Sequence, residues 1–306
     1  MKWYQHICLE LLWGLFLVIS ITPRCFRYYI LKPFLALLLI LSHYRHKVIA
    51  ENLSKSFPEK SRQEIRKLVR SYYIHLAEVA VDIISLVGAS ERRKDRAVNW
   101  VNAKEVAERL DGKDWIAVGA HYGCWEYLPL WSRKQMCNTF MSVYHPMSSV
   151  VFDCFFQRMR RYSDNITTVP MKSTITYYLR NRNKGKGIIL GLLSDQSPNL
   201  RADTHWFRFL NQDTAFIDGA ESIATKFRIP ILFAYTKRVA PGRYNVILEE
   251  IYDGKEEVAQ HEITQRYATR LEEMIKEQPE LWMWSHKRWK HTPEKQAKKF
   301  GASTLK

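Results

Sequence analysis

The residues best suited to acid–base chemistry lie in the stretch WIAVGAHYGCWEYLPLW, which covers Trp115–Trp131. It begins with a short apolar run, long enough for a buried strand, and His121 follows at once. Glu126 comes five positions after His121, in a segment predicted to be helical as far as Trp131. A histidine between a strand and a helix would lie at the carboxyl edge of a sheet, where open α/β folds place their reactive groups.

This pair of residue types can activate a hydroxyl group. A neutral imidazole can take a proton from an alcohol near pH 7, and a carboxylate on its other nitrogen fixes the tautomer and stabilises the imidazolium. Helical side chains five positions apart diverge, so the pair works only if His121 lies in the turn before the helix. The alternative is a histidine that caps a loop and a Glu126 on a solvated helix face.

The segments that would position this pair include both strands and helices. The apolar runs predict strands over Trp115–Gly119, Thr139–Tyr144, Gly187–Leu193, Pro230–Lys237 and Arg243–Glu250. The spacing of apolar residues predicts helices within Val48–Glu91 and over Val150–Tyr162, Met171–Arg182, Asp218–Phe227 and Glu262–Lys276. Ser61 and Glu64 form a capping box inside the first of these helical regions. Residues 197–217 are predicted to be irregular, and the charged chain after Pro293 to be frayed.

Composition limits the class of partner. The 306 residues suffice for one large domain or two small ones, and 46% apolar residues with ten tryptophans can bury a substantial core. The formal net charge of +16 favours anionic partners. Because the chain has no zinc-ligand spacing and no aromatic-and-glycine RNA-binding string, an anionic membrane and an acidic carrier protein fit better than nucleic acid. Five cysteines without a C-x-x-C spacing favour reduced thiols in the cytosol, and no metal-ligand cluster is present.

The N-terminal segment predicts a membrane anchor. Ile7–Ile21 is apolar with few exceptions and is flanked by aromatic residues. The alternative, a signal peptide, lacks a small-residue cleavage site. Because lysine and arginine are denser after the segment than before it, the bulk of the chain is expected in the cytosol. Tyr28–Leu41, broken by Lys32 and Pro33, is predicted to be a helix at the interface or packed on the globular domain, with a second membrane pass as the alternative.

The motifs together resemble a known family. H-x4-E between a strand and a helix is typical of glycerolipid and lipid A acyltransferases, and the wider string resembles the lipid A biosynthesis acyltransferases of the lysophospholipid acyltransferase-like superfamily. Their usual H-x-G-N-W-E stands here with Cys124 in place of asparagine, and Tyr144-His145-Pro146 has a histidine where arginine is usual. The segments around Val48–Tyr73 and Trp282–Trp289 also resemble the family, so the resemblance runs over nearly the whole chain.

The resemblance implies a fold and a division of the chain. The fold would be α/β, a mixed β-sheet flanked by helices as in glycerolipid acyltransferases, with an N-terminal membrane-anchoring helix. Residues 1–44 would be the anchor and interfacial helix, residues 45–292 the acyltransferase domain and residues 293–306 a disordered tail. The protein would lie on the cytoplasmic face of the cell inner membrane, held by a single anchor.

The resemblance also implies a reaction. A fatty acyl chain would pass from the thioester of an acyl carrier protein to a hydroxyl of a phosphorylated glycolipid, a lipid A precursor, without cofactor or metal. His121 would be the general base and Glu126 would hold it. Arg158, Arg160 or Arg161 would grip a phosphate or the phosphopantetheine of the carrier, or else form a solvated helix end. Asp195 and Gln196, which follow the strand Gly187–Leu193, match an Asp-Gln/His motif; Asp195 would orient an arginine or the acceptor sugar, or else shape a turn.

Three alternatives remain open from the sequence. The same chemistry could acylate another lipid, such as a glycerolipid or an aminolipid. Cys124 could be a nucleophile that forms an acyl-enzyme with His121 as its base. A non-catalytic membrane protein could use the basic surface to bind lipid or carrier. The acyl-chain length and the oligomeric state cannot be deduced from the sequence.

Overall fold

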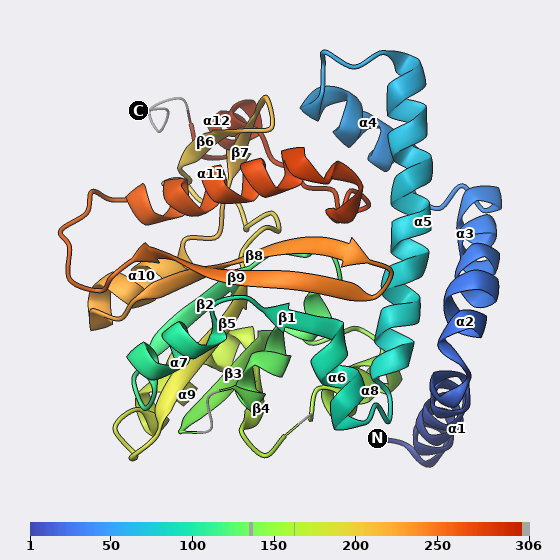
Figure 1. Ribbon diagram of the computed structural model, residues 1–306. Helices are drawn as coiled ribbons and strands as arrows, with labels where there is room; N and C mark the ends of the chain where they lie inside the picture. Colours follow the sequence, from blue (N-terminus) through green and yellow to red (C-terminus); the bar gives the residue numbers. More distant parts are fainter. Residues whose placement is uncertain (135–136, 162, 302–306) are drawn as a thin grey trace.

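A mixed β-sheet forms the centre of the molecule (Figure 1). The computed structural model describes residues 1–134, 137–161 and 163–301. In this part of the chain the sheet has seven strands in the order β1-β9-β8-β2-β5-β3-β4. The strands are β1 Val98–Trp100, β2 Trp115–Gly119, β3 Asn138–Tyr144, β4 Ile166–Pro170, β5 Gly187–Leu193, β8 Ile231–Ala240 and β9 Arg243–Tyr252. The mixed α/β fold expected from the family resemblance is confirmed.

Strand direction places the carboxyl ends of the central strands together. The strands β8, β2, β5, β3 and β4 run parallel to one another, whereas β9 runs antiparallel to β8 and pairs in parallel with β1. The strands β2 and β5 read as continuous apolar runs because helices cover both faces of the sheet. Polar residues that follow β2 and β5 therefore meet at one edge.

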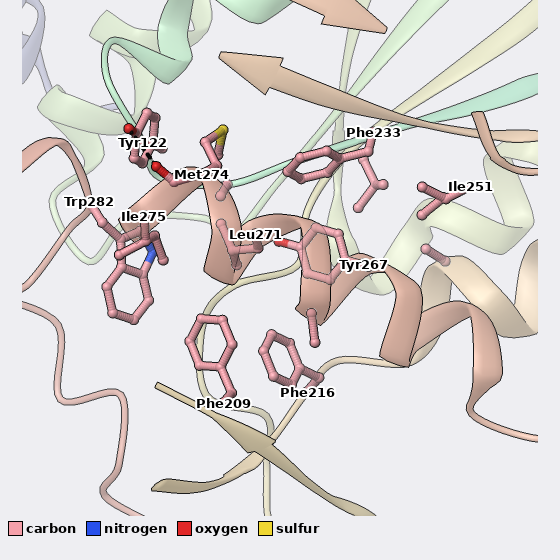
Figure 2. Close-up of a cluster of buried hydrophobic side chains, with 14 of the residues drawn as sticks. Tyr122, Phe209, Phe216, Phe233, Ile251, Tyr267, Leu271, Met274, Ile275 and Trp282 are labelled. Atoms are coloured by element: carbon pink, nitrogen blue, oxygen red, sulfur yellow. Dashed lines mark hydrogen bonds between the residues drawn. The ribbon is translucent and has the colours of Figure 1, made fainter. Parts of the chain in front are cut away.

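Each face of the sheet packs against its own helices. Figure 2 shows one of the two cores, in which Tyr267, Leu271 and Met274 of α11 point towards Phe233 and Ile251 of the sheet. The opposite face packs on Trp131 and other residues of a 3₁₀ helix and on α7 and α8. The covering elements are α7 Ala103–Leu110, the 3₁₀ helix η2 Trp125–Arg133, α8 Val150–Met159, α9 Thr174–Asn181, α10 Gly219–Phe227 and α11 Glu262–Glu277.

The N-terminal helices lie in a column along α5, at the right of Figure 1. The long helix α5 begins at the predicted capping box, where the Ser61 hydroxyl accepts from the Glu64 N–H and the Glu64 carboxylate accepts from the Ser61 N–H. The column consists of α1 Trp3–Ile21, α2 Arg24–Phe26, a π-helical turn Arg27–Leu31 and α3 Lys32–Leu41, and α4 His46–Ser56 joins it to α5 Arg62–Leu86. The segment Tyr28–Leu41 is thus helical and packs on α5, as one of the two alternatives predicted.

The helix α1 has the length and composition to cross a membrane. It is 19 residues long, its mean hydropathy is 1.6, and only 11% of the window is buried by the rest of the protein. Leu11, Val18 and Ile21 are more than half exposed, so α1 has a large apolar surface that the described chain does not cover. Such a helix is compatible with a membrane anchor, and a signal sequence has the same properties.

Three structural predictions were incomplete or wrong. The strands β1 and β4 were not predicted, and residues 197–217 contain a hairpin of β6 Trp206–Phe209 and β7 Gln212–Ala215. The tail is ordered over α12 Pro293–Phe300, which Thr292 caps and Gln296 ties to the loop at Ala202. Tyr162, the last residue of one predicted helix, and tail residues 302–306 lie outside the described residues.

Candidate active site

The candidate site lies where β2 and β5 end beside each other. Gly119 of β2 pairs with Leu193 of β5, so the residues that follow, His121 and Asp195, leave the sheet together. Gly123 completes the turn after His121 with φ of 57°, and a Cβ atom there would lie 2.7 Å from the Tyr244 ring. Only glycine fits this turn, because both the left-handed backbone and the close approach of the ring exclude a side chain.

Asp195, not Glu126, is the carboxylate on the His121 ring. His121 Nδ1 lies 2.7 Å from Asp195 Oδ1, and Asp195 Oδ2 accepts from the His121 backbone N–H at 2.9 Å. Trp282 Nε1 donates to the same Oδ2 at 2.9 Å. The predicted contact of Glu126 with His121 is therefore wrong, because Asp195 is the carboxylate that contacts the imidazole. The reason is sheet order, because β5 lies directly beside β2.

The surroundings of Asp195 favour its ionised form. Its side chain is 2% exposed, and burial alone would raise the pKa of Asp195. His121 and the N–H groups of His121 and Trp282 outweigh burial, so the pKa of Asp195 is lowered. A carboxylate that accepts from His121 Nδ1–H leaves the lone pair of the neutral imidazole on Nε2.

The free side of the imidazole faces a large cavity. His121 Nε2 lies 3.3 Å from the Gln196 amide, which donates to it when Nδ1 carries the proton. His121 and Gln196 both line a cavity of about 680 Å³, large enough for part of a sizeable substrate. A contact of 3.3 Å is a long hydrogen bond that an incoming hydroxyl can replace.

Glu126 pairs with an arginine instead. Arg160 Nε lies 2.8 Å from Glu126 Oε2, and Arg160 Nη2 lies 2.5 Å from Glu126 Oε1, a bidentate ion pair. The Glu126 side chain is 4% exposed and the Arg160 side chain 18% exposed. Arg160 lines the cavity together with His121 and Gln196. Glu126 and Asp195 join this group through their contacts with Arg160 and His121, respectively.

The other two predicted arginines lie elsewhere. Arg158 pairs with Glu10 of α1 at 2.8 and 3.0 Å, and its guanidinium lies over the Trp13 ring at 4.1 Å. Arg158 therefore ties α8 to the N-terminal helix. Arg161 is exposed, and of the three arginines only Arg160 is among the described residues that line the cavity.

A narrow apolar slot adjoins the cavity. It measures about 60 Å³ and runs between the sheet and η2. Small residues on three adjacent strands make room for it, because side chains at Gly119 or Gly191 would meet Leu128 or Phe140 at less than 3 Å. The small residues that line it are Ala117 and Gly119 of β2, Gly191 of β5 and Ala234 of β8.

Aromatic rings line the slot, and its mouth is shared with the cavity. Trp131 forms edge-on pairs with Trp100 and Trp115, with centroid distances of 5.1 and 6.1 Å. The lining residues common to slot and cavity are Trp125, Val143, Arg160, Leu192 and Leu193. The Glu126–Arg160 pair is thus the charged feature at a junction between an apolar slot and a mixed cavity.

Cys124 is poorly placed to be a nucleophile. Its side chain is 4% exposed, and burial followed by the charges of Asp82 and Glu126 raises its pKa well above the ordinary thiol value. A neutral, buried thiol is a weak nucleophile. His145, the other departure from the family pattern, lines the cavity.

The C-terminal segment Leu281–Met283 holds the loop that contains His121, a role that the sequence pattern did not assign to it. The Gly123 N–H donates to Leu281 O at 3.0 Å and the Met283 N–H donates to His121 O at 3.1 Å. Trp282 and Trp284 are 2% and 0% exposed, so both tryptophans pack in the core of the domain. Figure 2 shows Trp282 beside Ile275 of α11, on the side of the core that Phe209 also approaches.

Fold and site together combine a buried His–Asp pair at the carboxyl edge of a mixed α/β sheet with an adjoining apolar slot. In a comparison with protein families, the model of the bacterial lipid A biosynthesis acyltransferases matches residues 4–291. The chain therefore belongs to the bacterial lipid A biosynthesis acyltransferase family. No curated protein sequence matches it.

Proposed function

We propose that this chain transfers a fatty acyl group from the thioester of an acyl carrier protein to a hydroxyl of a phosphorylated lipid A precursor, at the cytoplasmic face of the inner membrane. The observation that carries the proposal is the His121–Asp195 pair, on the side of a cavity that meets an apolar slot. The α1 helix supplies the anchor, and the charge of +16 suits two anionic partners.

In this mechanism His121 Nε2 removes the proton of the acceptor hydroxyl as its oxygen attacks the thioester carbonyl. Asp195 keeps the proton on Nδ1 and stabilises the imidazolium that forms. The carbon–sulfur bond breaks, the chain forms an ester with the acceptor, and the imidazolium returns its proton to the leaving thiolate.

Arg160 is proposed to stabilise the negative charge that develops on the thioester oxygen. Arg160 lines both the slot and the cavity, and a fixed guanidinium at this junction can donate hydrogen bonds to an oxyanion. Glu126 then orients Arg160 through two hydrogen bonds rather than acting on the base. The slot holds the hydrocarbon chain of the donor.

A direct test supplies the purified protein with radiolabelled acyl groups on acyl carrier protein and, separately, on coenzyme A, with lipid A precursor or a glycerolipid as acceptor. Mass spectrometry of the products should show one added acyl ester on the precursor, from the carrier protein donor. Acylation of the glycerolipid alone would favour the other acyltransferase hypothesis, and binding without transfer would favour a non-catalytic protein.

A further inference from the structure

A second cavity, about 530 Å³ in volume, lies at the end of α1. Its walls come from the α1–α2 bend, the last turn of α5, the β8–β9 turn and α6 Glu91–Ala97. Figure 1 shows α6 beside the lower end of α5, with α1 at the same end of α5 but on its other side. Among the described residues this cavity shares no lining residue with the reaction cavity or the slot.

The cavity is lined by cations. No aspartate or glutamate is among the described residues that line it. The nearby carboxylate of Glu91 already pairs with Lys94 at 2.8 Å and with Arg133 at 2.6 Å. The cationic lining residues are Arg24, Arg27, Arg92, Arg93, Lys94, Arg96 and Arg243.

The innermost of these cations is Arg27, which is only 4% exposed. Arg27 Nη1 donates to the carbonyl oxygens of Ser20 and Thr22, and its Nε has no hydrogen-bond partner within the described chain. Arg93 Nη1 donates to the same Ser20 oxygen at 2.8 Å. Two guanidinium groups therefore converge on one carbonyl, which is a neutral acceptor and does not balance their charge.

The electrostatics of Arg27 agree with this geometry. Burial, followed by the charge of Arg93, lowers the pKa of Arg27. An anion inside the cavity would offset both effects, because it would pair with the guanidinium groups. Arginine binds phosphate oxygens with two parallel hydrogen bonds, which makes phosphate the natural anion for such a cluster.

We propose that this cavity binds the phosphate of an anionic phospholipid and so fixes the end of α1 at the membrane surface. Ile21 and Phe26 are exposed at 67% and 39% beside the cavity, where the acyl tails of a bound lipid would lie. The proposal that the phosphate comes from a lipid rests on the membrane association proposed above for α1, and it does not depend on acyl transfer.

The test uses the full chain in an uncharged detergent and measures binding by calorimetry. The ligands are dihexanoyl phosphatidylglycerol, dihexanoyl phosphatidylcholine and inorganic phosphate. The two lipids have the same tails and the same phosphodiester but differ in net charge. We expect phosphatidylglycerol to bind at least tenfold more tightly than either of the others. Hydrogen exchange should then show protection of residues 23–27 and 90–96.

The matched variants each remove two positive charges. Arg93→Gln/Arg96→Gln changes the cavity, whereas Arg66→Gln/Arg70→Gln changes exposed residues of α5 outside it. We expect the first to weaken phosphatidylglycerol binding at least tenfold and the second less than twofold. If the first double variant does not fold, the single variant Arg243→Gln, which changes an exposed residue of the cavity, should still weaken phosphatidylglycerol binding several-fold.

Three results would overturn the proposal. Equal losses in the two double variants would show general attraction to a basic surface. Equal affinity for the two lipids would show that lipid charge is not recognised. Inorganic phosphate that binds as tightly as phosphatidylglycerol would show a free-phosphate site and exclude the lipid as its source.

Discussion

At the scale of single residues, the site depends on which side chain each of its two carboxylates contacts. Asp195 accepts from three N–H groups and faces His121, whereas Glu126 accepts from Arg160. In the proposed mechanism the two carboxylates therefore orient two different groups, the imidazole that acts as the base and the guanidinium that binds the oxyanion.

The role of Asp195 predicts a loss of rate without a loss of substrate affinity. In Asp195→Asn the amide can donate to Nδ1, which moves the imidazole proton to Nε2 and removes the lone pair that acts as the base. We expect kcat to fall about 10³-fold with KM within threefold of the wild type. Steady-state kinetics would measure both, and a change confined to KM would contradict the orienting role.

The role of Glu126 predicts a different pattern. Glu126→Gln should lower kcat about 10-fold to 10²-fold, because one neutral amide orients Arg160 less well than a bidentate carboxylate. Arg160→Gln should lower kcat at least as much, and the double variant should be little worse than Arg160→Gln alone. Additive losses in this cycle would mean that Glu126 acts independently of Arg160.

The site residues could be found from sequence, but their pairing could not. His121, Asp195 and Gln196 follow predicted strands, Glu126 lies in the predicted helix after His121, and Arg160 lies near the end of another predicted helix. Which carboxylate meets the imidazole depends on β5 lying beside β2, 74 positions away in sequence. Local spacing favours the nearer Glu126, and only the strand order corrects it.

At the scale of elements, the sheet creates the slot through its small residues. Ala117 pairs with Gly191 across β2 and β5, and Gly119 lies against Ala234 of β8. Because larger residues at these positions would fill the space under η2, the sheet determines how deep a chain can enter.

Narrowing the slot should shorten the chain that is transferred. Ala117→Leu adds three carbon atoms to a residue that lines the slot. We expect the preferred acyl group to become shorter by about two carbon atoms, with the rate for that shorter donor within tenfold of the wild type. Competition between carrier-bound chains of different lengths would show this, and an unchanged preference would mean that the chain lies elsewhere.

The elements that were not predicted lacked their usual local signals. The β6–β7 hairpin turns at Leu210 and Asn211, which have φ of 48° and 60°. Such turns normally carry Asn-Gly, so a buried leucine gives no turn signal. The Leu210 N–H donates to Glu272 of α11 at 2.8 Å, a tertiary contact that helps to hold the unusual backbone. By contrast, β2 and β5 were predicted to the residue because they are continuous apolar runs.

At the scale of the whole molecule, α5 carries a buried histidine that links stability to pH. His75 is 5% exposed, and its polar neighbour is the backbone of Leu281, which is not within good hydrogen-bond geometry of either ring nitrogen. Burial lowers the pKa of His75 to about 4; the charge of Glu78 opposes this shift, and Arg238 and Lys32 reinforce it.

This histidine should destabilise the protein in acid. Between pH 6.5 and 4 the unfolded chain binds a proton that folded His75 does not, so the free energy of unfolding falls as the pH falls. His75→Phe removes this linkage, and its stability advantage should grow by about 3 kcal/mol over that window. Urea titrations of both proteins at pH 7 and pH 4.5 would measure most of it. A constant difference would place the acid sensitivity elsewhere.

The measurement that tests the central claim most directly is the single-turnover rate of acyl transfer by His121→Ala, with the unfolding midpoint as a control. If the imidazole is the base, the rate should fall at least 10²-fold while the midpoint stays within a few degrees of the wild type. Transfer by the folded variant at the wild-type rate would show that another group deprotonates the acceptor.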